Sequence, residues 1–249
     1  DFCDLPAQPG QCGTGPLGRK PSPSCAGGYA CNGVSAGCVA TCTSDAGCVG
    51  ARCGAGGVCI AKVETLTDDF NTGGFDASTW SSVHTSCSNV NQQLRITTTP
   101  ATTIYASIDS ARRYDFLDSE IRIQIVDAGN QSLTSMQAYT QMCTYPTSNR
   151  CLTLILGNQN ALVQLTDNGM YPLLIGYFPL TGRGTYRMRE DGGTTYLENL
   201  SDAGTWLTLG SATTPFRNDW QDVRVSLGAG TYMPETTAST VIWDNLNSP

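Results

Sequence analysis

SEIRIQIVD, residues 119–127, has the pattern that decides the fold class. Its three isoleucines alternate with Arg122 and Gln124, so an extended strand would be apolar on one side and polar on the other. A sheet with one face against a core and the other in water produces this period of two. The segment therefore predicts an antiparallel sheet with a polar outer face.

Similar short runs follow one another along the rest of the chain, separated by Gly, Asn, Asp and Pro, and none has helical periodicity with caps. About a dozen such strands predict two stacked antiparallel sheets. We expect an all-β fold: an antiparallel two-sheet jelly-roll sandwich with a small disulfide-rich N-terminal region. The clearest strands are residues 92–99, 119–127, 133–142, 151–157, 161–167, 184–190, 194–200, 205–211, 222–228 and 239–246.

The cysteines are concentrated at the start of the chain, where Gly, Ala, Pro and Ser dominate. Such a segment buries too little apolar area to offset chain entropy, so cross-links are needed. Zinc is disfavoured because the spacings lack a CxxC pair and His84 is distant. We expect a disulfide-stapled region over residues 1–66, a β-sandwich over 67–249, and an extracellular or cell-surface location. Nine of the 12 cysteines precede residue 60: Cys3, Cys12, Cys25, Cys31, Cys38, Cys42, Cys48, Cys53 and Cys59.

An odd number of N-terminal cysteines cannot pair entirely among themselves. Cys143 and Cys151 flank a turn-like segment, TYPTSNR, and would form a local disulfide. Cys87 is then left to bond with one of the nine N-terminal cysteines. The alternative is a free Cys87 and a free N-terminal partner.

The charge of the chain and its apolar stretches each exclude one class of partner. With 14 basic and 21 acidic side chains, the net charge is −7, whereas nucleic-acid binding requires a basic patch. The longest apolar stretch, residues 171–180, is too short for a membrane span and contains prolines. We expect neither nucleic acid nor a membrane as partner.

Four segments resemble a known family: DDFNTGGFDASTW (68–80), YLENLSDAGTWLTLG (196–210), DVRVSLGAG (222–230) and VIWDNLN (241–247). Together they are similar to the concanavalin A-like, laminin-G-like jelly rolls of secreted bacterial proteins. The N-terminal TSDAGC…C…GGVC pattern resembles small cysteine-rich modules of myxobacterial-type surface proteins. This fold serves lectins, hydrolases and structural modules alike, so function must be argued at the site.

Laminarinase-type glycoside hydrolases on this fold carry the strand motif E-x-D-x-x-E, whose two glutamates act as nucleophile and acid. The nearest segment here, residues 120–125, has arginine and glutamine where carboxylates are needed. Glu198 stands alone, and His84 lies in an ordinary polar segment. We therefore expect no catalytic residues and a protein that is not an enzyme.

Residues 133–142 place one tyrosine between two glutamines on the same side of a strand. An aromatic ring flanked by amides suits carbohydrate, because the ring stacks on the sugar and the amides bind its hydroxyls. Arginines on two other strands would extend this face and favour acidic sugars; the alternative is a merely solvated sheet face. The predicted ligand-binding residues are Arg122, Gln124, Gln137, Tyr139, Gln141, Arg187 and Arg189.

Three carboxylates lie on segments that this architecture would make neighbours: Asp68, Asp69 and Asp244. Carboxylates near loop carbonyls suit Ca²⁺, although a dense ligand pattern is lacking. We expect no required cofactor and a possible structural calcium ion at these residues.

These observations favour a secreted or cell-surface recognition or adhesion protein without catalytic activity, binding a glycan or another surface ligand. The alternative is a structural subunit of an extracellular fibre or coat, in which exposed strand edges join further copies of the chain. A polysaccharide hydrolase is the third hypothesis.

Overall fold

The computed structural model describes residues 41–48, 50–133, 135–180 and 183–248, together with the backbone of four short N-terminal strands. The chain divides into two compact units, Asp1–Lys62 and Val63–Pro249. The short strands pair as two antiparallel ladders: β1 (Phe2–Cys3) with β2 (Cys12–Gly13), and β3 (Cys31–Asn32) with β4 (Gly37–Cys38).

Disulfides and a hairpin organise the described part of the first unit. The hairpin joins β5 (Ala51–Gly54) to β6 (Val58–Lys62), and the 3₁₀ turn η1 (Asp45–Gly47) precedes it. Two disulfides, Cys42–Cys53 and Cys48–Cys59, tie the turn to the hairpin. These four cysteines are therefore cross-linked, as expected. The side chains of the other five N-terminal cysteines lie outside the described residues.

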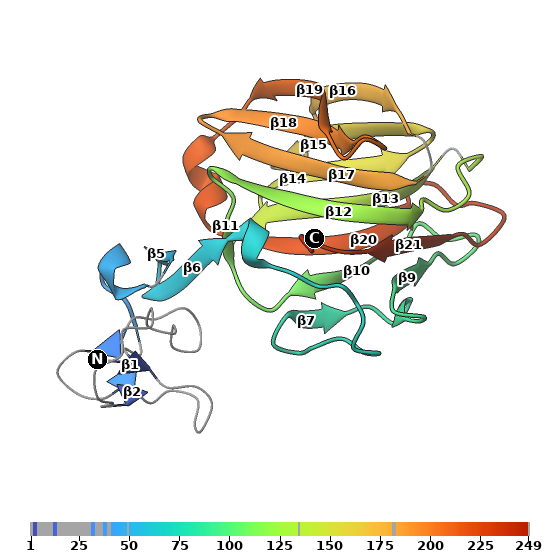
Figure 1. The fold of residues 1–249 in the computed structure, drawn as a ribbon. Coiled ribbons are helices and arrows are strands. Elements are labelled where there is room, and N and C mark those ends of the chain that lie inside the picture. Colours follow the sequence, from blue (N-terminus) through green and yellow to red (C-terminus); the bar gives the residue numbers. More distant parts are fainter. Residues whose placement is uncertain are drawn as a thin grey trace. The chain divides into compact units, whose positions relative to one another are not determined.

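The second unit contains two antiparallel sheets, which form the two layers in Figure 1. The first sheet has the order β16-β15-β14-β13-β20-β10-β7, and β11 also pairs with β20. Its strands are β7 (Trp80–Val83), β10 (Tyr105–Ser110), β11 (Tyr114–Asp115), β13 (Met136–Thr144), β14 (Arg150–Gly157), β15 (Asn160–Asp167), β16 (Leu173–Pro179) and β20 (Val223–Thr231).

The second sheet has the order β19-β18-β17-β12-β21-β9-β8. Two short 3₁₀ segments, η2 (Val63–Thr65) and η3 (Arg217–Gln221), are the helical elements among the described residues of this unit. The expected all-β two-sheet sandwich is confirmed. The strands of the second sheet are β8 (Cys87–Asn89), β9 (Leu94–Thr97), β12 (Ser119–Asp127), β17 (Gly184–Asp191), β18 (Thr194–Leu200), β19 (Trp206–Thr213) and β21 (Thr240–Asp244).

The core lies between the two sheets and follows the period of two that the sequence shows. On β12, Ile121, Ile123 and Ile125 point inward and are at most 1% exposed. The inward side of β13 begins with Met136 and Ala138, which belong to the same apolar cluster. Burying one such aliphatic side chain stabilises the fold by roughly 1.5–3 kcal/mol.

The expected disulfide between Cys143 and Cys151 is present and joins directly opposed residues of β13 and β14. The expected bond from Cys87 to an N-terminal cysteine is wrong, because Cys87 on β8 is a free, buried thiol. Its side chain packs in the core of the sandwich, where a thiol behaves as a small apolar group. Burial raises the pKa of Cys87 to about 11, which keeps the thiol protonated.

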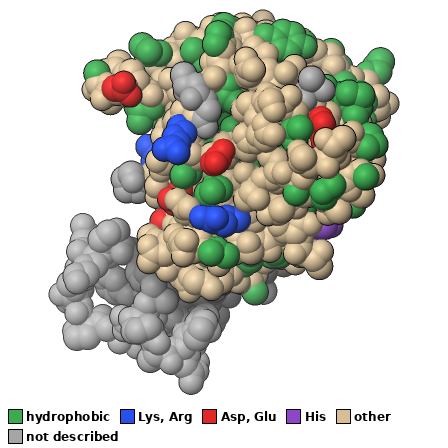
Figure 2. All heavy atoms as spheres, turned by 90° about the vertical axis from the view of Figure 1, so that its right-hand side faces the viewer, with side chains coloured by type: hydrophobic (Ala, Val, Ile, Leu, Met, Phe, Trp, Pro, Cys, Tyr) green, Lys and Arg blue, Asp and Glu red, His purple; other side chains and the backbone are tan. Residues whose placement is uncertain are grey.

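Two surface features bear on the class of protein. Among the described residues, no helix combines the length and apolar character that crossing a membrane requires. Figure 2 shows one face on which few charged side chains lie scattered among polar and hydrophobic ones. The described part of this face has no broad basic patch, in agreement with the low charge content of the sequence.

Candidate functional site

The seven predicted ligand-binding residues lie on two different sheets. Gln137, Tyr139 and Gln141 occupy the outer face of β13 in the first sheet. The predicted arginines and Gln124 lie on the outer face of β12 and β17 in the second sheet. The two groups are thus on opposite sides of the sandwich, so the prediction of one continuous polar face is wrong.

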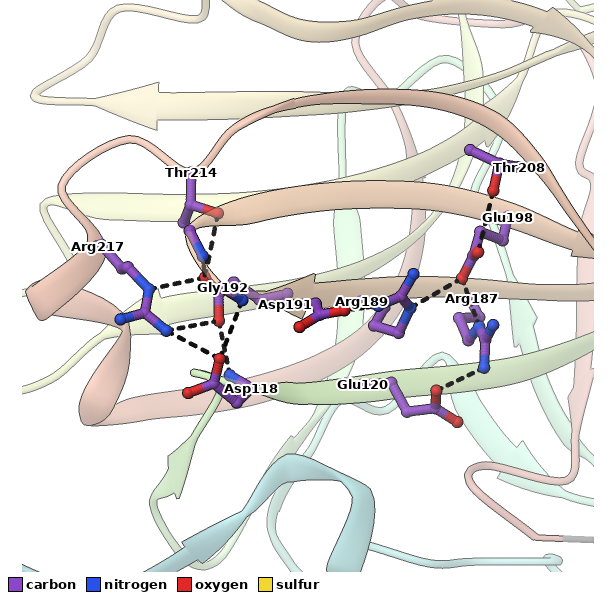
Figure 3. Close-up of polar contacts among 12 residues, drawn as sticks. Asp118, Glu120, Arg187, Arg189, Asp191, Gly192, Glu198, Thr208, Thr214 and Arg217 are labelled. Carbon is purple, nitrogen blue, oxygen red and sulfur yellow. Dashed lines mark hydrogen bonds and ion pairs between the residues drawn. The ribbon is translucent and has the colours of Figure 1, made fainter.

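Arg187 is held by carboxylates of its own sheet, as Figure 3 shows. Its Nη1 lies 2.6 Å from Glu120, and its Nε lies 2.6 Å from the buried Glu198. The guanidinium also stacks 4.1 Å from the centre of the Trp206 ring. All these partners belong to the protein, so Arg187 is already paired in the absence of a ligand.

Arg189, two residues further along β17, is also held by carboxylates and an aromatic ring (Figure 3). It pairs with Glu198 at 3.3 Å and with Asp191 at 2.8 Å, and it lies over the Tyr196 ring. Burial alone would raise the pKa of Glu198, but the hydrogen bonds from Arg189 and Arg187 lower it overall. Both arginines therefore already have partners within the sheet, and their predicted role in acidic-sugar binding stays a prediction.

The two predicted residues on β12 hold the C-terminal segment. Arg122 donates from Nη2 to the carbonyl of Ser248, and its backbone N–H donates to Asn247. Gln124 accepts a hydrogen bond from the Asn245 amide. Both side chains therefore have structural partners in place of a ligand.

The three predicted calcium ligands have partners close by in the sequence. Asp68 accepts hydrogen bonds from the backbone N–H of Phe70 and from the Trp80 indole, at 2.7 and 2.6 Å. Asp69 and Asp244 each accept a backbone N–H from a residue one or two positions later. Within the described part of the chain, their oxygens do not converge as a group of three. The calcium ion stays a prediction.

The outer side of the first sheet has a different character, and we call it the tyrosine face. It consists of four rows of side chains that cross strands β10, β20, β13, β14 and β15. The rows are Tyr105, Gly230, Gln137, Gly157, Asn160; Ser107, Gly228, Tyr139, Ile155, Leu162; Asp109, Ser226, Gln141, Thr153, Gln164; and, without a β10 member, Arg224, Cys143, Cys151, Thr166.

Two glycines on β20 make room for the tyrosine rings. A Cβ on Gly228 would lie 2.1 Å from the Tyr139 ring, and one on Gly230 would lie 2.5 Å from the Tyr105 ring. The two rings meet edge to face at 5.8 Å, and the Tyr105 hydroxyl donates to Gln137. The rings and the amide are therefore fixed in position over the strand.

A cleft of about 300 Å³ lies at the Gln137 end of this face. Exposed tyrosines, 64% for Tyr171 and 67% for Tyr177, and several amides line it. Such a lining can stack on a sugar and hydrogen-bond its hydroxyls. The sequence pattern missed both tyrosines, because residues 171–180 carry only an apolar signal. The polar and aromatic lining includes Gln137, Asn158, Asn160, Gln164, Tyr171 and Tyr177.

Among the described side chains of the four rows, Asp109 is the one carboxylate. Its Oδ1 accepts a hydrogen bond from the Ser107 hydroxyl at 3.0 Å. Ser107 also forms a hydrogen bond with Tyr139. Burial raises the pKa of the Tyr139 phenol, and the hydrogen bond with Ser107 offsets part of this rise. Tyr139, Ser107 and Asp109 thus form a short hydrogen-bonded chain on the face.

The far end of the face, in the fourth row, is cationic. Arg224 is exposed on β20, and its guanidinium lies 5.2 Å from the centre of the Tyr145 ring. Arg113 lies 4.7 Å from the same ring and pairs with Asp222 at 2.9 Å. Within the described part of the chain, no carboxylate pairs with Arg224.

No protein-family model matches the sequence, and no curated protein matches it. Solved structures do resemble it. They include the β-glucanase of Bacillus licheniformis (9% identity, TM-score 0.53, 72% of this chain and 95% of that one). They also include the catalytic domain of an endo-1,3-β-glucanase (laminarinase) of Thermotoga petrophila (9%, 0.55, 72% and 94%). A third is LamA of Zobellia galactanivorans in complex with laminaritriose and laminaritetraose (9%, 0.55, 72% and 96%).

These similarities correct the functional prediction. Our expectation of a non-catalytic recognition or adhesion protein, or of a structural subunit, is contradicted because the structures that share this architecture include β-glucanases and laminarinases. The expectation that the protein is not an enzyme is contradicted by the same finding. At this level of identity the likeness shows the fold, which is the concanavalin A-like jelly roll that the sequence resemblance implied.

Proposed function

We propose that this protein is a glycoside hydrolase that acts on an extended polysaccharide bound along the tyrosine face. The observation that carries the proposal is the cleft of about 300 Å³ with its exposed tyrosines and amides. The fold adds support, since the structures that resemble the chain include enzymes described as acting on β-glucans.

Binding would use the physical features of this cleft. Tyr171 and Tyr177 offer flat rings that stack on the C–H face of a sugar. Gln137, Asn158 and Asn160 offer amide donors and acceptors for its hydroxyls. The four rows continue beyond the cleft, so a bound chain several sugars long would keep contact with the sheet.

Proton transfer is assigned to Asp109, the carboxylate on the described part of this face. Glycosidic cleavage commonly uses two carboxylates, although some families draw on the substrate or on a tyrosine instead. The chain has no E-x-D-x-x-E segment, so the two-glutamate arrangement of that motif is not the one proposed. Ser107 holds one oxygen of Asp109, which gives the acid a defined position on the face along which the glycan would extend.

The test is a reducing-end assay of the whole protein with laminarin, mixed-linkage β-glucan, xylan and galactan. We expect release of reducing ends from at least one polymer. Asp109→Asn should lower the rate about 100-fold or more, because a positioned acid or base contributes at least that factor. The matched control is Asp202→Asn, in an exposed turn, which should leave the rate unchanged. No release from any polymer by the wild-type protein would overturn the proposal.

We also infer that the protein acts outside the cell. Three disulfides support this, since such bonds persist in oxidising compartments. In this proposal residues 1–66 form a cysteine-rich module of the kind found in myxobacterial-type surface proteins, joined to a sandwich over 67–249. Peptide mapping of the native protein without reductant should recover the three bonds. Recovery of six free thiols would contradict the inference.

A further inference from the structure

Arg224 differs from the other arginines that the structure describes in the sandwich. Most of these have a carboxylate or carbonyl partner inside the protein, whereas the contact that the described residues provide for Arg224 is with an aromatic ring. It is also exposed to solvent. An exposed guanidinium without a counter-charge is available to an external anion. The arginines with carboxylate partners are Arg113, Arg150, Arg187, Arg189 and Arg217.

The position of Arg224 relates it to the glycan cleft. Gly230 lies in the row that borders the cleft, and Arg224 lies six residues earlier on the same strand and on the same face. Six residues of strand span about 20 Å. A polysaccharide several sugars long that occupies the cleft would therefore reach Arg224.

The surroundings of Arg224 suit an anionic group. Opposite it in the register is Cys143, whose disulfide to Cys151 provides a small apolar floor. Ser226, two residues along the same strand and in the next row, offers a hydroxyl donor. A second guanidinium, that of Arg113, stacks on the same tyrosine ring and adds to the local positive charge, although Asp222 offsets part of it. Asp109 faces the same side from the third row.

We infer that Arg224 selects polysaccharides that carry an anionic group, a carboxylate or a sulfate, and binds that group at the end of the tyrosine face opposite the cleft. This inference rests on the proposed function. The guanidinium fork matches both anions with two parallel hydrogen bonds. Neutral glycans would be bound by the cleft alone, whereas anionic ones would gain a second point of attachment.

The experiment measures dissociation constants of the whole protein by affinity electrophoresis in low salt. The probes are laminarin as a neutral polymer, polygalacturonate as a carboxylated one and carrageenan as a sulfated one. We expect at least one anionic polymer to bind more tightly than laminarin, and Arg224→Gln to weaken that binding about tenfold, with laminarin unaffected. The anionic probe whose binding falls identifies the group.

The matched control is Arg112→Gln, which removes another exposed arginine, outside the four rows. An equal loss of anionic binding in Arg112→Gln would show a general charge effect and overturn the inference, as would unchanged binding in Arg224→Gln. Cleavage or binding of laminarin alone, with no dependence on Arg224, would leave the proposed function intact and reject only the inference. Absence of binding and cleavage with every polymer would reject the proposed function and the inference with it.

Discussion

Gly228 shows how a single residue shapes the tyrosine face. The missing side chain leaves space for the Tyr139 ring, whose nearest atom would lie 2.1 Å from an added Cβ. The segment SLGAGTY contains both glycines of β20, but a sequence pattern alone does not reveal which ring fills the space. The outward alternation of Gln137, Tyr139 and Gln141 was visible from the sequence, whereas the tyrosines of the cleft were not.

Gly228→Ala should therefore displace Tyr139 and destabilise the protein by about 1–3 kcal/mol, as overpacking does. Chemical denaturation followed by tryptophan fluorescence measures this change. Gly176→Ala is the matched control, because no atom lies within 4 Å of a Cβ there. Equal stability of the two variants would contradict the close packing described for Gly228.

Glu198 is the residue with which both arginines of β17 pair. It is 4% exposed and pairs with Arg187 and Arg189, so Glu198→Gln should destabilise the protein by about 3 kcal/mol at neutral pH. Asp191→Asn, whose side chain is 66% exposed, should cost less than about 1 kcal/mol. Urea unfolding of the two variants measures both values.

The ion pairs of Glu198 with Arg187 and Arg189 make the free energy of unfolding depend on pH, with a defined sign. Because the folded-state pKa of Glu198 is lowered, its stabilisation is complete above the ordinary glutamate value of about 4.3 and is lost as the pH falls through the folded-state value. The difference in unfolding free energy between the wild type and Glu198→Gln should therefore shrink below about pH 4. A difference that stays constant from pH 7 to pH 3 would contradict the ion-pair description.

At the scale of elements, the sequence predicts where most of the long strands lie but not which strands pair with one another. The alternation in residues 119–127 predicted β12 with its full bounds and its buried face. β7, β8, β10, β11 and β16 were missed. β7, β8 and β11 have four residues or fewer, and β16 is irregularly paired and ends at a proline. The sequence also gives no sign that β12 and β13, which follow one another, belong to different sheets, and this separates the arginines from Tyr139.

The hairpin of β13 and β14 carries the disulfide Cys143–Cys151. The bond stabilises the hairpin and forms part of the surface of the tyrosine face. Replacing Cys143 and Cys151 together by serine should lower the free energy of unfolding by about 2 kcal/mol, since a short loop is no longer closed in the unfolded chain. Thermal unfolding of the variant and the wild type measures this loss. Unchanged stability would show that the bond does not constrain the unfolded state.

At the scale of the whole molecule, composition and periodicity predicted the class of fold, and the structure confirms it. They did not predict which outer face would carry the cleft, because that depends on which strands share a sheet. Cys87 illustrates the same limit: counting thiols predicted a bond, whereas the packing of β8 buries the residue in the core as a free thiol. We propose that polysaccharide is bound and cut on the tyrosine face.

The most direct measurement is kcat/KM for the preferred polysaccharide in the double variant Tyr171→Ala, Tyr177→Ala. The control is Leu207→Ala, an exposed apolar side chain on β19 of the other sheet. Loss of two stacking rings should lower kcat/KM about tenfold or more, while circular dichroism stays unchanged and the control keeps full activity. Full activity of the double variant, or an equal loss in Leu207→Ala, would contradict polysaccharide binding at the tyrosine face.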